Sequence, residues 1–68
     1  FSEITQIILD FIEKHQVVKR SILLRTFYRE LDIPTLKMIE DMMEQMKTVK
    51  IVRNMVENEV TYYFLGKG

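Results

Sequence analysis

The chain has 68 residues, 47% of them hydrophobic, and its ten lysines and arginines balance ten acidic residues. This length allows at most one small domain, and the absence of cysteine excludes disulfides and thiolate metal sites. The zero formal charge argues against strong non-specific binding of polyanions, because proteins that bind them in this way are usually basic. No apolar run approaches the ~20 residues that cross a bilayer, so we expect no membrane partner. Because the chain begins at Phe1 and not at Met, we expect it to be a piece of a longer protein.

The first predicted element is a helix over residues 2–15, with Ser2 as a suitable N-cap. Its apolar residues have helical spacing and predict one buried stripe, formed by Ile4, Ile7, Ile8, Phe11 and Ile12. Leu9 lies off this stripe, so we expect it to be exposed or to touch another part of the parent protein. His15 continues the stripe, and a single histidine near a helix C-terminus is more often a partly buried structural side chain than a ligand.

A short strand and a second helix are predicted next. Val17 and Val18 favour extended backbone, which predicts an edge strand over residues 16–19. Ser21 is an N-cap for a helix over about 22–31. The apolar positions of this helix are Leu24, Phe27, Tyr28 and Leu31. Positive charge gathers around it without any carboxylate, at Lys14, Lys19, Arg20, Arg25 and Arg29.

A turn over residues 31–35 leads into the third helix. Pro34 suits the first helical position, because its φ is already helical and the N–H that it lacks would have no partner there. Asp32 or Thr35 can satisfy nearby N–H groups, and we expect Ile33 to be the apolar anchor between the two helices.

The third helix is predicted over about 34–47 and has two different faces. One side of the helical wheel is apolar, with Leu36, Ile39, Met42, Met43 and Met46. The other side is slightly acidic, with Lys37, Met38, Asp41, Glu44 and Gln45. The carboxylates of Glu40, Asp41 and Glu44 have a spacing that is common on solvated helices, so we expect no metal site there.

The last third of the chain changes to the pattern of β-strands. Strands are predicted at about 50–56 and 60–65, joined by a tight link in which Asn58 tolerates a positive φ. We expect one alternating set to face the helices, consisting of Ile51, Tyr63 and Leu65. The opposite set should be more exposed and contains Met55, Tyr62 and Phe64.

This order of elements resembles the winged helix-turn-helix superfamily over nearly the whole chain. The clearest match is I-E-D-M-M-E-Q-M-K-T-V-K-I-V-R-N followed by V-T-Y-Y-F-L-G. The resemblance implies that residues 1–68 form a single α+β domain, with three helices, a C-terminal two-stranded β-hairpin (the wing) and a possible short strand after the first helix. Family members often have glycine after the third helix, where this chain has Thr48, Val49 and Lys50.

The resemblance implies binding to double-stranded DNA, with the third helix in the major groove and the wing on the backbone. The residues expected to face bases are Thr35, Lys37, Met38, Asp41 and Gln45. The residues expected to contact phosphates are Lys19, Arg20, Arg25, Arg29, Lys50 and Arg53. The acidic outer face of the third helix and the wing carboxylates, Glu57 and Glu59, would weaken such binding. We therefore expect modest, salt-sensitive affinity from the basic face around the second helix, in a nuclear or nucleoid-associated protein.

The alternative is a protein-interaction module within a larger complex, which the balanced charge fits better. Its contact patch would consist of Leu9, Met38, Met55, Tyr62 and Phe64. An enzyme is not expected, because the chain has no glycine-rich phosphate loop and its single histidine has no nucleophile at a recognisable spacing. We also expect no cofactor and no small-molecule substrate.

Overall fold

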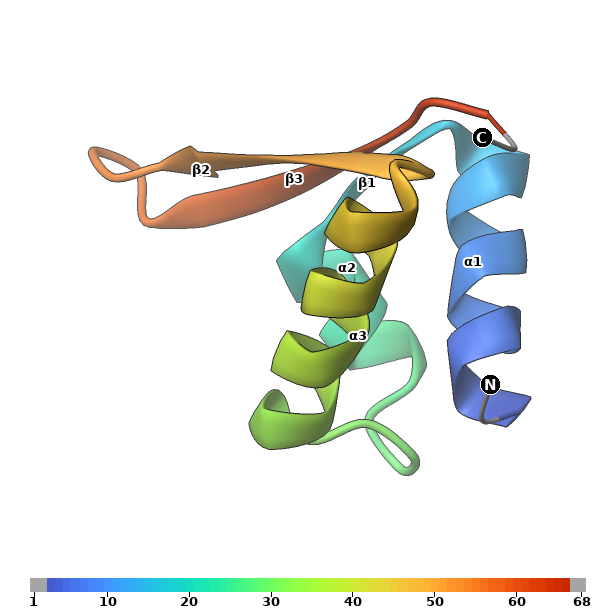
Figure 1. Ribbon diagram of the computed structural model, residues 1–68. Coiled ribbons are helices and arrows are strands. Elements are labelled where there is room, and N and C mark those ends of the chain that lie inside the picture. Colours follow the sequence, from blue (N-terminus) through green and yellow to red (C-terminus); the bar gives the residue numbers. More distant parts are fainter. Residues whose placement is uncertain (1–2, 67–68) are drawn as a thin grey trace.

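Three helices pack on one face of a three-stranded antiparallel sheet in the computed structural model, which describes residues 3–66 (Figure 1). The elements are α1 (Glu3–His15), β1 (Val17–Lys19), α2 (Arg20–Thr26), α3 (Ile33–Met46), β2 (Val49–Asn54) and β3 (Glu59–Phe64). The strands lie in the order β1-β3-β2, and the β2–β3 hairpin extends well past the helices (Figure 1). The predicted α+β composition is therefore confirmed. Within residues 3–66, no helix has both the length and the apolar character needed to span a membrane.

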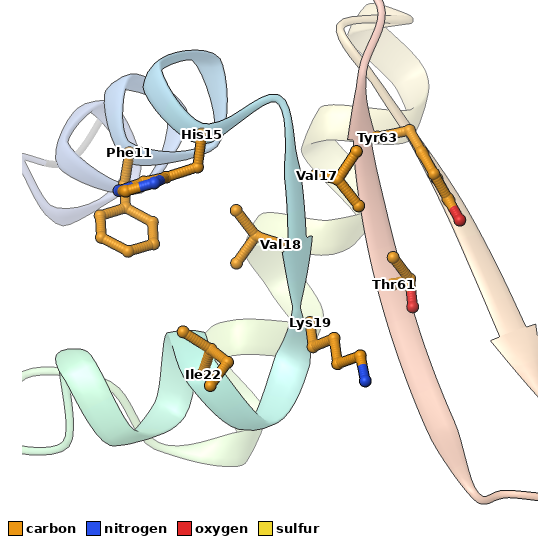
Figure 2. A pocket seen from close by; sticks show the side chains of 8 residues that line it. All are labelled: Phe11, His15, Val17, Val18, Lys19, Ile22, Thr61 and Tyr63. Atoms are coloured by element: carbon orange, nitrogen blue, oxygen red, sulfur yellow. The ribbon is translucent and has the colours of Figure 1, made fainter.

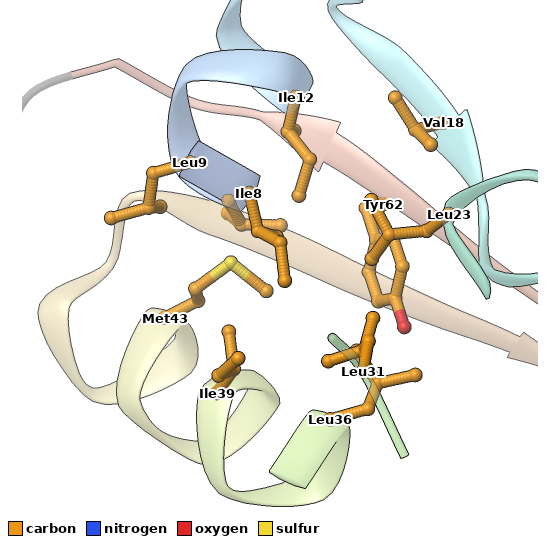
Figure 3. Close-up of a cluster of buried hydrophobic side chains, with 11 residues drawn as sticks. Ile8, Leu9, Ile12, Val18, Leu23, Leu31, Leu36, Ile39, Met43 and Tyr62 are labelled. Atoms are coloured by element: carbon orange, nitrogen blue, oxygen red, sulfur yellow. The ribbon is translucent and has the colours of Figure 1, made fainter. Parts of the chain in front are cut away.

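Helix α1 buries a face that is rotated from the predicted stripe. Ile8 and Ile12 are buried as expected, but so are Thr5 and Leu9, whereas Ile7 is exposed. The expectation that Leu9 is exposed was wrong because α1 faces α3 as well as the sheet, and Leu9 joins the same buried cluster as Met43 of α3 (Figure 3). The predicted cap Ser2 lies outside the described residues.

Strand β1 is confirmed, and it passes directly into α2 without a loop. The predicted cap was wrong: α2 begins at Arg20, and Lys19 is the N-cap, with no side-chain capping hydrogen bond. Because β1 is paired to β3, the strand fixes where the helix starts and which face it buries. That face is centred on Leu23, which the predicted stripe omitted. The helix ends at Thr26, and Tyr28 in the following turn is exposed rather than buried.

The turn before α3 has the predicted cap and a different anchor. The side chain of Asp32 accepts a hydrogen bond from the backbone N–H of Thr35 at 2.8 Å, and Pro34 lies in the first helical turn. Ile33 is exposed, so its expected role as the apolar anchor was wrong. Leu31 is the apolar anchor instead, because its side chain is buried in the core just before the N-cap of the helix.

Helix α3 buries Leu36, Ile39 and Met43 as predicted, and it ends at a left-handed residue. Lys47 has a φ of 58°, and its N–H donates to the carbonyl oxygens of Glu44 and Met43. Left-handed backbone just after the last helical residue is a common way to end a helix, although the residue is more often glycine.

Strand β3 presents to the helices the side chains that were expected outside, whereas Ile51 of β2 packs against the core as predicted. Tyr62 lies opposite both Val18 of β1 and Ile51 of β2, so these three form one inward row. Tyr62 is fully buried and Phe64 packs against the core, whereas Tyr63 is exposed. The predicted facing of β3 was wrong, because a shift of one residue in register moves every side chain of a strand to the other face, while Met55 is exposed as predicted.

Every described helix and strand contributes to one hydrophobic cluster (Figure 3). The cluster consists of Ile8, Leu9, Ile12, Val18, Leu23, Leu31, Leu36, Ile39, Met43, Val49 and Tyr62. The inward row of the sheet and the three helices therefore share a single core, which leaves the outer face of α3, the hairpin tip and the β1 edge available for contacts with other molecules.

Candidate interaction surfaces

A polar cluster of Arg20, Glu40 and Tyr62 lies at the edge of the core. Arg20 Nη2 is 2.8 Å from Glu40 Oε2 and 3.0 Å from Oε1, and Arg20 Nε donates to Oε2 at 3.1 Å. The hydroxyl of Tyr62 donates to the same Oε2 atom. These contacts join α2, α3 and β3 through a carboxylate that is itself buried.

The pKa values of two members of this cluster, Tyr62 and Arg20, are raised above their ordinary values. Burial, followed by the hydrogen bond to Glu40, raises the pKa of the Tyr62 phenol well above its ordinary value, so the phenol stays a neutral donor. Burial by itself lowers the pKa of Arg20, but hydrogen bonds to Tyr62 and Glu40 outweigh it and the pKa is raised. Arg20 is therefore held as a charged partner of Glu40, which makes it less available to a phosphate than the other predicted contacts.

Glu40 was expected to be a solvated carboxylate, and the sequence holds a signal against that expectation. It lies four residues after Leu36 and three before Met43, so on a helix it must neighbour both of these buried side chains. A carboxylate in that position needs a partner, because an unpaired charge is costly to bury. What the sequence does not reveal is that the partners come from α2 and β3.

Most of the other predicted DNA contacts reach solvent. The exposed basic and amide side chains are Lys19, Arg25, Arg29, Lys37, Gln45, Lys50 and Arg53, while Thr35 is half-buried. Arg29 donates from Nε to the hydroxyl of Tyr28 at 3.0 Å and lies 5.6 Å from the centroid of that ring. Arg53 is 3.8 Å from Glu44 Oε1, an exposed ion pair that ties β2 to α3. The basic residues are thus spread over α2, α3 and the sheet.

The outer side of α3 and the tip of the hairpin form a second feature, which we call the α3–hairpin surface. It consists of Met38, Asp41, Glu44, Met55, Val56 and Glu57. The exposed fractions are 70% for Met38, 87% for Met55 and 97% for Val56. The Glu44–Arg53 ion pair ties α3 to β2 below the tip, and the hairpin projects past α3 (Figure 1).

The apolar tip of this surface is held by an ordered turn. The side-chain oxygen of Asn54 accepts hydrogen bonds from the N–H groups of Val56 and Glu57, at 3.0 and 3.1 Å. Asn58 completes the turn with a φ of 52°, as the sequence predicted for this residue. Val56 was not among the predicted contact residues, although an apolar pair within a polar turn could have identified it.

The predicted protein-interaction patch divides into two groups. Met38 and Met55 are exposed. Leu9 and Tyr62 are buried and Phe64 packs against the core, so the exposure predicted for these three was wrong. Their side chains belong to or pack against the core, because α1 buries a rotated face and β3 has the opposite facing from the one predicted.

A third feature is a groove of about 390 Å³ along β1 (Figure 2). It is lined by Phe11, His15, Val17, Val18, Lys19, Ile22, Thr61 and Tyr63. His15, expected to be partly buried, is exposed and its ring lies 4.4 Å from that of Phe11, measured between centroids. The groove combines residues from α1, β1, α2 and β3, which the sequence alone does not bring together.

In comparisons with known proteins, no family model, curated protein or solved structure matches the chain. Within residues 3–66, no group of three or more histidine and acidic side chains is arranged to hold a metal ion. The surfaces open to a partner are the α3–hairpin surface, the exposed basic residues and the groove along β1.

Proposed function

We propose that the chain is a winged helix-turn-helix module that docks a partner protein through the α3–hairpin surface. The order of its helices and strands supports this fold assignment, with the β2–β3 hairpin as the wing and β1 as the additional short strand. A shared fold does not determine the ligand, so the choice of partner rests on the chemistry of the surface itself.

The observation that carries the proposal is the nearly complete exposure of Met55 and Val56 on an ordered turn. Large apolar side chains held in contact with water are typical of surfaces that another protein covers. Glu57 follows them in the same turn, and Asp41 and Glu44 are exposed on α3. Such groups would repel DNA phosphates, whereas they complement a protein surface whose apolar pocket is bordered by lysine or arginine.

Site-specific photo-crosslinking in cells of the natural host tests this proposal. A photoreactive amino acid at Val56 and, separately, at Met38 should give adducts with the same protein. A probe at Gln6, which is exposed on α1, serves as the matched control and should not give that adduct. A protein that carries both the Met38 probe and the substitution Val56→Asp should no longer form the adduct. Adducts that share no partner, or that form equally well from Gln6, would contradict the proposal.

Duplex DNA is the second candidate partner, and a specific observation favours it. Lys19, Arg25, Lys37 and Lys50 are exposed and take part in no ion pair within the described part of the chain. If these residues bind phosphates, affinity falls steeply with salt, because each neutralised phosphate releases bound counterions. Fluorescence anisotropy with labelled duplex DNA over a salt series measures this slope. A slope near zero, or no binding at low salt, removes DNA as a partner.

A further inference from the structure

Strand β1 has one unpaired edge. The C=O of Gln16 accepts a hydrogen bond from the N–H of Phe64 at 2.9 Å. Antiparallel pairs alternate between bonded and non-bonded positions, so Val18 is the next residue bonded to β3. The N–H groups of Val17 and Lys19, and the C=O of Val17, therefore point away from the sheet. No hydrogen bond of a loop or turn within residues 3–66 uses these groups.

The groove lies where a further strand would pair with this edge. Figure 2 shows Val18 turned toward Phe11 and Ile22 on the helix side, and Val17 turned the other way, toward Tyr63. An added strand would place its alternate side chains against these two walls, since successive side chains of a strand point to opposite faces. Val17 is 53% exposed, so its apolar side chain is available to such a strand.

The charges of the lining indicate what the groove accepts. Lys19 and His15 line it, and no carboxylate does. A second copy of this chain would bring the same basic residues together, whereas a segment with carboxylates would complement them. We propose that β1 binds an extended, acidic and apolar segment of a partner protein, which joins the sheet as a fourth strand. This site shares no residue with the α3–hairpin surface, so an experiment can refute one of the two proposals and leave the other standing.

Binding of a defined peptide tests the proposal. The probe is a blocked eight-residue peptide in which valine alternates with glutamate and threonine, titrated into isotopically labelled protein. We expect amide shifts and slowed hydrogen exchange at Val17 and Lys19, with side-chain shifts at Phe11 and Ile22. The same peptide methylated at its pairing amide nitrogens should not bind, because it lacks the donors that pair with the open edge.

A matched pair of charge reversals tests the occupant. Lys19→Glu should raise the Kd for the acidic peptide about threefold or more. Lys37→Glu should leave it unchanged, because Lys37 is exposed on α3, which contributes no residue to the groove. The proposal is overturned by the absence of binding, by equal binding of the methylated peptide, or by shifts that leave Val17 and Lys19 unmoved. It is also overturned if these two signals change with protein concentration alone, since the occupant would then be a second copy.

Discussion

The carboxylate of Glu40 occupies the core only because Arg20 and Tyr62 satisfy it. Removing one member of a buried ion pair leaves an uncompensated charge, which is far more costly than losing an exposed pair. The chain also has an arginine, a glutamate and a tyrosine that are exposed, namely Arg25, Glu44 and Tyr28. Arg20, Glu40 and Tyr62 differ from these exposed residues in their burial and pairing, so substitutions in the cluster test the packing of the core most strongly.

Substitutions in this cluster should show its importance for stability. We expect Arg20→Met to lower the free energy of unfolding by about 3 kcal/mol, the low end for a buried pair, because the arginine side chain is 28% exposed. Tyr62→Phe should cost about 1.5 kcal/mol, since it removes one hydrogen bond to a charged group. Arg25→Met, an exposed arginine on the same helix, should cost less than about 0.5 kcal/mol. Urea denaturation measures all three, and equal costs for Arg20→Met and Arg25→Met would refute the account of the cluster.

Asp32 predicts a pH effect with a definite sign. Its hydrogen bonds with Thr35 hold the pKa of its carboxyl below the ordinary value of 3.8. The folded state thus favours the ionised form, so this contribution to stability is complete above that value and is lost as pH falls through the folded pKa. Asp32→Asn keeps a good cap and removes the titration. It should match the parent chain at pH 7 and lose less stability on acidification. An identical acid profile for the two proteins would contradict this role.

At the scale of elements, spacing along the chain predicted each helix and strand, while their exact faces depended on contacts between them. Leu9 is an example, because helical spacing places it beside the main stripe and only its packing in the tertiary structure makes it buried. Tyr62 is another: both faces of β3 carry aromatic side chains, so the sequence alone does not decide the register. The end of α2 was missed for a similar reason, because apolar residues continue with helical spacing through the turn at 27–30.

The end of α3 gives a prediction about backbone strain. The left-handed φ of Lys47 is unfavourable for a lysine, whereas asparagine tolerates the similar φ of Asn58. Lys47→Gly should therefore raise the free energy of unfolding by about 0.5–1 kcal/mol. Asn58→Gly is the matched control and should change it by less than about 0.5 kcal/mol. Thermal and urea unfolding of both variants check the difference, which would be absent if Lys47 were unstrained.

At the scale of the whole molecule, the single core could be predicted from composition, but the surfaces could not. The cations predicted to bind phosphate looked equivalent in the sequence, yet Arg20 is held by Glu40 and Arg53 by Glu44. The groove at β1 depends on residues from four elements. In contrast, the apolar hairpin tip is formed by the consecutive residues Met55 and Val56, so this pair beside Glu57 was visible in the sequence.

A duplex DNA titration followed by amide chemical shifts tests the central claim most directly, because it reports which surface responds. We predict that the signals of α3 and the hairpin stay unmoved, and that any shifts at low salt are confined to the region of Lys19 and Arg25 and vanish at about 0.15 M salt. Shifts that run along residues 37–45 and the hairpin tip, and that persist at this salt concentration, would contradict the account and identify the α3–hairpin surface as a DNA-binding surface.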